Sequence, residues 1–544
     1  MDHDGGLTGP STGGRRRRWT AALAVVVALA LLASAFRLPV GGAAPAHAPE
    51  AVRAAEPDLR ITGFAPDSYD PAESADVGTA ATLAQLYEGL TAFDPSLTVR
   101  PALARDWQVD ADGRRIVFRL RDGLTFSDGS PLAAGDVVRS WLRVIRPDRP
   151  SPLASLLADV EGALDYLTGR ESDPETVGIR ALDRERVEVR FRTPASYFLA
   201  AAASPTLAVV PPGIETGASM RPGTFVGSGG YVLAAAGDTA LTLEANARYW
   251  AGPPALGRIE MITDLAGESP VTRFEDGLLD YTGIASYDAS WIGWDRDLGA
   301  SLRAVPSLTV EYYGFDTTRP PFDDARVRRA FALAVDWRRL ATLAGSDYEA
   351  ANSLVPPGIP GRSNADFLPP HDPDEAQRLL ADAGFPGGAG FPDVALQTGG
   401  NAFDAAVRES FREELGVTLR AEVLDDFFAR LYSDDPPLLW HLGWIADYPH
   451  PQDFLGLLLG GGQVTNYGRW SDPDYDAALT RAAEATDPAA QRAAYDDAER
   501  IVRDQVPIVP VAYSAGWALS REGLLGADPA GIGIIRFAGL AWDR

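Results

Sequence analysis

Apolar and polar positions along the chain predict short β-strands that alternate with amphipathic helices. Residues 107–109 and 116–120 are two strand-like runs separated by an Asp- and Gly-containing turn at 110–113, a pattern typical of a β-hairpin. In the second run the apolar side chains, beginning with Ile116, alternate with polar ones such as Arg119. One face of the hairpin is therefore expected to be buried and the other exposed to solvent.

Three helices are predicted from their first residues and their periodicity. Asp323 or Asp324 should cap a helix whose apolar positions between 327 and 335 recur at helical spacing. An Asp-Pro pair opens each of the other two helices, which are expected over 372–384 and 487–502.

The last long apolar run, residues 506–513, contains Pro507 and Pro510. Because proline cannot donate a ladder hydrogen bond, this run is expected at a sheet edge or in a segment that crosses between two parts of the fold. Strands and helices interleave along the chain without a strict βα rhythm and without an internal repeat. This arrangement favours mixed α/β lobes over a barrel or a doubly wound sheet.

The N-terminal segment has the pattern of an export signal. Four arginines at 15–18 precede an apolar run from Trp19 to Phe36. As a helix this run would span about 27 Å, close to the hydrocarbon thickness of a bilayer, and the preceding charges orient its N-terminus inside. Residues 46–48 have the small-x-small form of a cleavage site, although Pro49 follows them. Residues 1–55 are therefore expected to be either a cleaved signal peptide with its linker or an uncleaved transmembrane anchor.

The composition excludes several kinds of chemistry. All 49 basic residues of the 544-residue chain are arginine, and the chain contains no cysteine. It therefore has no lysine for a Schiff base or a phosphate loop, and no residue for a thiolate nucleophile, a disulfide, a lipid anchor or a cysteine-ligated metal. The net charge of −26 also disfavours nucleic-acid binding, which requires a basic surface.

The remaining motifs favour neither catalysis nor metal binding. The chain has no Gly-x-Ser-x-Gly or His-Glu-x-x-His sequence, and its adjacent acidic pairs are better explained by solvated turns and helix faces. Imidazole and carboxylate ligands for zinc or nickel could come from four residues: His441, Asp447, His450 and Asp453. Their spacing fits no standard site. We therefore expect no enzymatic activity, no cofactor and no metal.

Short motifs occur in a fixed order along most of the chain: Tyr87–Leu90, Pro101–Ala104, Trp107, Phe118–Gly123, Phe126–Leu132, Asp136-Val137, Gly227–Tyr231, Asn246, Arg248–Trp250, Phe274–Gly277, Asp280, Pro321–Ala330, Gly443–Pro449 and Pro507–Pro510. Together they resemble the extracellular solute-binding proteins of ABC transporters, a family that includes the oligopeptide- and dipeptide-binding proteins. The resemblance runs from about residue 57 to the C-terminus.

This resemblance implies an α/β, two-lobed periplasmic-binding-protein-like fold with a discontinuous lobe I and an additional inserted domain. Crossover strands near 306–313 and 507–513 would form a hinge between the lobes. Mapped onto this sequence, lobe I comprises residues 57–92, 209–305 and 506–544, the inserted domain comprises 93–208, and lobe II comprises 306–505.

The resemblance also implies where a ligand is held. In peptide-binding members the aspartate of the Gly-Trp-x-Ala-Asp-Tyr segment, here Asp447, pairs with the free α-amino group of the ligand, and Trp444 would form an aromatic wall beside it. Taken alone, Asp447 could instead stabilise a turn and Trp444 could pack in a core. Tyr448 and Tyr513 are further candidate ligand contacts. His441 is a fifth candidate ligand contact, and it stands where oligopeptide binders can have an arginine, so the residue that would hold a ligand carboxylate is not identified.

The implied function is that of an extracytoplasmic, monomeric solute-binding protein. It would capture a peptide, or a similar small polar ligand, in an interlobe cleft and deliver it to the permease of an ABC importer. One alternative is a different cargo, either an oligosaccharide or a nickel chelate, and stacked aromatic residues would favour a sugar. Another alternative is a membrane-anchored sensor or scaffold that keeps the same fold.

Overall fold

The computed structural model describes residues 57–74, 76–345, 347–433, 435–485, 487–527 and 533–543. The chain divides into two units, residues 1–56 and 57–544, and the account below concerns the second. The apolar run 19–36, predicted to be a signal or an anchor, lies outside the described residues. Within the described ranges, no helix is long and apolar enough to cross a bilayer.

Strands from distant parts of the chain form one mixed sheet, which has eleven strands within the described residues. The order is β15-β14-β16-β12-β17-β11-β1-β10-β9-β8, and β13 pairs with β17 outside this order. The strands are β1 (Leu59–Thr62), β8 (Tyr231–Ala236), β9 (Ala240–Ala245), β10 (Arg258–Ile262), β11 (Tyr281–Ile284), β12 (Leu302–Phe315), β13 (Tyr348–Ala350), β14 (Ala395–Thr398), β15 (Arg420–Val423), β16 (Leu439–Ile445) and β17 (Ile508–Ser520).

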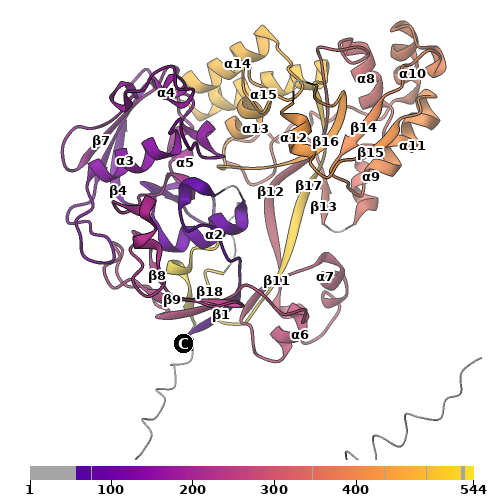
Figure 1. Ribbon diagram of the computed structural model, residues 1–544. Helices are drawn as coiled ribbons and strands as arrows, with labels where there is room; N and C mark the ends of the chain where they lie inside the picture. The colour runs from indigo at the N-terminus through magenta and orange to yellow at the C-terminus, as the bar shows by residue number, and fades with distance from the viewer. Residues whose placement is uncertain are drawn as a thin grey trace, which may run out of the picture. The chain divides into compact units, whose positions relative to one another are not determined.

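Two long strands, β12 and β17, connect the halves of this sheet and run side by side in Figure 1. Residues 302–306 of β12 pair with 515–519 of β17, and residues 310–314 pair with 508–513. Between these stretches the register shifts, so residues 307–309 have no partner on β17. A bulge of this kind bends and twists a strand. It falls within the segment predicted to be the hinge, and the hinge movement stays a prediction.

The half of the sheet from β11 to β8, here called lobe I, packs against three helices. A loop of this lobe approaches α2 very closely, because a Cβ atom added to Gly229 would lie 2.5 Å from the carbonyl oxygen of Gln85. The Gly-rich segment 227–230 therefore serves backbone packing. The elements of lobe I beyond the main sheet are α2 (Val77–Leu86), α6 (Pro270–Glu275), α7 (Ser286–Ile292) and the strand pair β18 (Leu524–Leu525) and β19 (Ala541–Trp542).

A separate antiparallel sheet of order β4-β5-β7-β6 packs on a distinct apolar core. It lies within residues 93–208, the predicted inserted domain; that name is kept below, and the division of the chain into these parts stays a prediction. The predicted hairpin is confirmed, since β4 and β5 pair, Ile116 and Phe118 are fully buried and Arg119 is exposed. The elements of this domain are β2 (Thr91–Phe93), β3 (Val99–Pro101), β4 (Ala104–Val109), β5 (Arg115–Leu120), α3 (Ala134–Val144), α4 (Ala163–Leu167), β6 (Ile179–Ala181), β7 (Arg186–Arg190) and α5 (Phe198–Ala201).

The other half of the main sheet, here called lobe II, has helices on both faces. Helices α8 to α11 supply the core on one face and α12 to α15 supply the core on the other. The three predicted helices are confirmed, and each begins after an aspartate whose carboxylate accepts a backbone N–H: Asp324, Asp372 and Asp487. The helices are α8 (Ala325–Leu333), α9 (Trp337–Ala344), α10 (Pro373–Asp382), α11 (Asp404–Leu415), α12 (Phe427–Leu431), α13 (Pro451–Leu459), α14 (Pro473–Glu484) and α15 (Pro488–Gln505).

Candidate ligand-binding site

Asp447 lies on the turn that joins β16 to α13 and is partly exposed. Pro451 occupies the first turn of α13, where its missing N–H and fixed φ are compatible with a helix start. The His450 side chain caps the helix, because its Nδ1 accepts a hydrogen bond from the backbone N–H of Gln452 at 3.2 Å. The turn that presents Asp447 is therefore held at its C-terminal end by a capped helix.

Asp453, in the first turn of α13, is fully buried behind this turn. Its Oδ2 accepts a hydrogen bond from the indole Nε1 of Trp444 at 2.9 Å and another from the backbone N–H of Asp447 at 3.3 Å. Its Oδ1 has no hydrogen-bond partner among the described residues. Asp453 thus fixes Trp444 and Asp447, two of the residues that the sequence predicts to meet the ligand, whereas the sequence suggested only a metal-ligand role for Asp453 itself.

The two carboxyl groups make this turn electrostatically unusual. Burial raises the pKa of Asp447 to about 6. Burial and the nearby negative charge of Asp447 raise the pKa of Asp453 well above its ordinary value. Within the part of the chain that the structure describes, neither group forms an ion pair with an arginine. A cationic group of a ligand would therefore find a carboxylate without a competing counter-ion.

Tyr448 joins the turn to the inserted domain. Its side chain is buried in the core of that domain, and its ring stacks on Tyr197 with centroids 5.7 Å apart and an interplanar angle of 16°. The hydroxyl of Tyr197 donates a hydrogen bond to Asp159. Trp444 packs against the core of the inserted domain and against one core of lobe II. The predicted site thus lies where lobe II meets the inserted domain.

His441 and Tyr513 lie outside the segment 444–448 that contains Trp444, Asp447 and Tyr448. His441 is buried on β16, where its ring lies 4.9 Å from that of Tyr313 and its Nε2 lies 3.2 Å from Glu311 Oε2. Tyr313 belongs to the core on the face of lobe II opposite to that of Tyr513.

The Tyr513 hydroxyl donates a hydrogen bond to the carbonyl oxygen of Ser353 at 2.8 Å and accepts one from the backbone N–H of Ser353 at 3.0 Å. These contacts fix a loop of lobe II. A ligand role for any of the five predicted residues stays a prediction.

No group of three or more histidine, aspartate or glutamate side chains suited to a metal ion occurs among the described residues. The Nδ1 of His450 accepts the helix-capping hydrogen bond, and burial lowers the pKa of this imidazole to about 4. His450 is therefore a neutral capping group near neutral pH.

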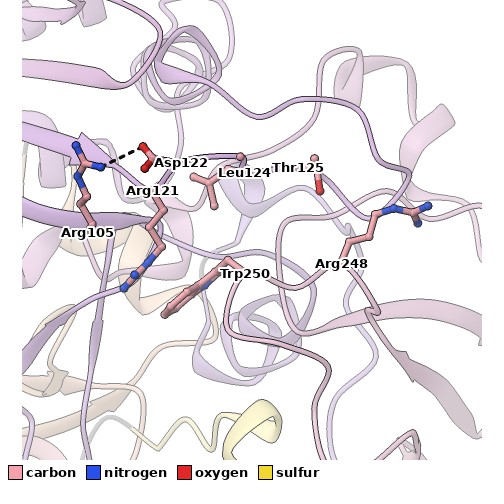
Figure 2. A pocket seen from close by; sticks show the side chains of 8 residues that line it. Arg105, Arg121, Asp122, Leu124, Thr125, Arg248 and Trp250 are labelled. Carbon is pink, nitrogen blue, oxygen red and sulfur yellow. Dashed lines mark hydrogen bonds and ion pairs between the residues drawn. The ribbon is translucent and has the colours of Figure 1, made fainter.

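A hollow with a volume of about 410 Å³ lies at the loop after β5 and the segment after β9 (Figure 2). The guanidinium of Arg121 lies over the ring of Trp250 at 4.0 Å, and Arg105 forms an ion pair of 3.0 Å with Asp122. None of the five predicted site residues lines this hollow. Arg121 and Arg105 already have partners, whereas Asp447 forms no ion pair among the described residues. A ligand site at the Asp447 turn stays a prediction.

Comparison with known proteins identifies the family. Residues 98–466 match the family model described as bacterial extracellular solute-binding proteins, family 5 Middle. The chain is 31% identical over 470 residues to the probable deoxycholate-binding periplasmic protein YgiS of Escherichia coli (strain K12), covering 82% of this chain and 86% of that protein. It is 28% identical to the periplasmic murein peptide-binding protein MppA of the same organism, covering 85% of this chain and 88% of MppA.

The fold agrees with a solved structure of one of these relatives. The unliganded open form of MppA, a periplasmic murein tripeptide binding protein, matches with a TM-score of 0.74 at 25% identity, covering 89% of this chain and 96% of that chain. The predicted fold class, an α/β two-lobed periplasmic-binding-protein-like fold, is thereby confirmed. The expected location outside the cytoplasm agrees with the periplasmic location in both relatives' names. The chain therefore belongs to the bacterial extracellular solute-binding proteins of family 5.

Proposed function

We propose that this protein captures a peptide, or a similar small polar ligand with a free amino group, and delivers it to the permease of an ABC importer. The observation that carries the proposal is the Asp447 carboxyl, partly exposed beside Trp444 and without a cationic partner among the described residues. An ammonium group would supply that partner and donate charge-assisted hydrogen bonds to the carboxylate. Trp444 would offer an apolar face to the first side chain of the ligand.

The charge of Asp447 also favours a peptide over deoxycholate, the ligand in the name of the relative YgiS. Deoxycholate carries a carboxylate, and the YgiS name associates that relative with it. At the Asp447 turn an anion would meet Asp447 itself, and the two carboxylates would repel each other. The MppA name associates that relative with a murein peptide, which agrees better with this turn.

Delivery would depend on movement about β12 and β17. Ligand that contacts both sides of the cleft would favour the closed form, and the permease would recognise that form. The N-terminal residues 1–55 would export the chain, and the apolar run 19–36 would then be either removed or kept as an anchor. Mass spectrometry of the exported protein, which gives its first residue, distinguishes these two outcomes.

A thermal-shift comparison tests the ligand class. Trialanine and murein tripeptide are compared with N-acetyl-trialanine, deoxycholate, maltotriose and a nickel–histidine chelate. At about a hundred times Kd a bound ligand stabilises the protein by about 2.7 kcal/mol, which a thermal shift detects readily. We expect shifts with the two free-amine peptides and none with the N-acetylated peptide.

The variant Asp447→Asn should lower the affinity for free-amine peptides at least about tenfold, because it removes the negative charge that pairs with an ammonium group. Asp487→Asn is the matched control, since Asp487 caps α15 and asparagine is an equally good cap. Peptide shifts of unchanged size in Asp447→Asn would show that the amine is held elsewhere. Shifts with deoxycholate, maltotriose or the chelate alone would overturn the peptide proposal and leave the family assignment in place.

A further inference from the structure

We propose that Asp453 is a neutral, protonated carboxylic acid at neutral pH, and that it positions Asp447 as a lone anionic acceptor for the ligand ammonium. The two carboxyl groups would then share one proton, and the turn would carry one negative charge instead of two. This inference rests on the proposed function for its ligand, but the protonation of Asp453 can be tested in the protein without a ligand.

Hydrogen bonding at Asp453 assigns the proton to one oxygen. Oδ2 already accepts the indole N–H of Trp444 and the backbone N–H of Asp447, so it acts as an acceptor. Oδ1 is buried and has no partner among the described residues. A buried, ionised oxygen without a donor or counter-ion is costly, and a buried carboxyl group avoids the cost by keeping its proton. The proton of the pair therefore belongs on Oδ1.

The groups around the pair supply no positive charge that would ionise Asp453. On its own segment the neighbours are Tyr448 and the capping imidazole of His450, which burial keeps neutral. From α15, Tyr495 faces the ring of His450 at 6.0 Å. From the inserted domain, Tyr197 stacks on Tyr448 and bonds to Asp159, which in turn pairs with Arg192 at 3.3 Å.

This arrangement sets how the ligand would bind. The ammonium group donates hydrogen bonds to the ionised Asp447, while Asp453 keeps its proton in both the empty and the bound protein. Where Asp447 is itself protonated, binding requires that its O–H bond breaks and that the proton goes to solvent. Affinity for an ammonium should therefore fall about tenfold per pH unit below the pKa of Asp447 and be constant above it. Capture at neutral pH and release in acid would follow.

Three variants of Asp453 and Asp447 distinguish a neutral Asp453 from an ionised one. Asparagine is a close structural match to a protonated aspartate, because its amide oxygen can accept both N–H groups and its NH₂ can replace the O–H. Trialanine affinity at about pH 7.5 should change by less than about threefold in Asp453→Asn. Asp453→Leu, which cannot hold Trp444 or the turn, should weaken binding at least about tenfold. Asp447→Asn should abolish the pH dependence together with most of the affinity.

A second measurement needs no ligand. The melting temperatures of the wild type, Asp453→Asn and the control Asp487→Asn are compared between about pH 5 and pH 8. A carboxyl group whose pKa is raised in the folded protein loses stabilisation as pH rises, so Asp453→Asn should gain in melting temperature relative to the wild type as pH increases.

The protonation of Asp453 and the proposed function can be contradicted independently of each other. A pH-independent difference between Asp453→Asn and the wild type would overturn the inference, because it would show that Asp453 is ionised throughout. A loss of about tenfold or more in trialanine affinity on Asp453→Asn would also overturn it, since an ionised Asp453 would then be attracting the ligand. If neither trialanine nor murein tripeptide binds the wild type at any pH, the proposed function fails, and the melting temperatures still decide the protonation of Asp453.

Discussion

Glu499 on α15 is a second buried carboxyl group, and among the described residues it forms no ion pair, although the charge of Arg362 is near enough to lower its pKa. Its Oε1 accepts the hydroxyl of Ser353, and its Oε2 accepts the backbone N–H of Leu354 at 3.2 Å. Burial raises the pKa of Glu499 to about 7. Glu499 therefore fixes the same loop that the Tyr513 hydroxyl holds from β17, and it does so as a group that keeps its proton into the neutral range.

Glu499→Gln should change how stability depends on pH. In the unfolded chain the Glu499 carboxyl ionises near its ordinary pKa, whereas in the folded protein it keeps its proton to about pH 7. Between these values the folded state binds the extra proton, so its stability falls as pH rises, by up to about 3 kcal/mol. Glutamine retains an acceptor for the loop and has no proton to lose. The variant should thus gain in free energy of unfolding relative to the wild type from about pH 5 to about pH 8.

Urea unfolding at a series of pH values measures this difference, with Asp487→Asn as the control for an exposed carboxyl. A constant offset between Glu499→Gln and the wild type would mean that Glu499 is ionised at every pH tested.

Individual residues also show where sequence reasoning reaches its limit. Asp447 and Trp444 could be singled out because a contiguous motif contains them, and the structure places them on one turn and the strand before it. The importance of Asp453 depends on its burial and on two hydrogen bonds, neither of which a motif displays. One signal was present in the sequence, namely an acidic residue in the first turn of a helix that begins at Pro451. Tyr448 stacks on Tyr197, a contact that spans 251 positions and could not be read locally.

At the scale of elements, close approach of β12 and β16 depends on a glycine. Gly314 of β12 pairs with Trp440 of β16, and a Cβ atom at position 314 would lie 2.4 Å from the indole ring. Trp440 is buried with 1% of its surface exposed, so the ring has little room to move. The absent side chain at Gly314 therefore leaves room for the indole ring of Trp440.

Gly314→Ala should destabilise the protein by about 1–3 kcal/mol, because an extra methyl group in a packed core forces side chains off their preferred positions. Gly283→Ala on β11 is a matched control, since a Cβ atom there meets nothing within 4 Å. The free energies of unfolding in urea give the comparison. Equal stability of the two variants would show that Trp440 can move aside, contrary to its close packing.

Helices were predictable in this chain where a few adjacent residues mark the first turn. Asp372-Pro373 and Asp487-Pro488 each combine a capping carboxylate with a proline in the first turn, and both helices begin there. Sheet order was not predictable from the same evidence. β1 pairs in parallel with β10 and β11, which come much later in the chain, and only the three-dimensional packing specifies these partners.

At the scale of the whole described unit, the inserted domain touches lobe II directly. The stacked rings of Tyr197 and Tyr448 form one contact, and the side-chain amide of Gln491 on α15 donates to the hydroxyl of Ser196 at 3.1 Å to form another. These contacts bring together a segment that precedes β12 and segments that lie between β12 and β17 in the sequence. Any movement that separates lobe II from the inserted domain must break them, and it must also uncover Tyr448, which is 1% exposed.

The variant Tyr197→Ala, which removes the stacked ring, should therefore release ligand faster than the wild type. A stacked aromatic pair contributes about 0.5–1.5 kcal/mol beyond the area that it buries, which corresponds to a two- to tenfold increase in the dissociation rate if the contact is lost on opening. Tyr197→Phe keeps the stacking and removes only the hydrogen bond to Asp159, so its dissociation rate should stay near that of the wild type. Tyr287→Ala, at a tyrosine of α7 that is 78% exposed, is a control for loss of an aromatic ring elsewhere.

Stopped-flow displacement of a fluorescent tripeptide measures these rates, and small-angle scattering of the ligand-free variants reports whether the lobes separate further. Faster release from Tyr197→Ala together with a larger radius of gyration would support a contact that keeps the cleft shut. A dissociation rate equal to that of the wild type would mean that the inserted domain and lobe II stay together when the ligand leaves. In that case opening must occur between lobe I and the other two parts, with the register shift at residues 307–309 of β12 as the place where the chain bends.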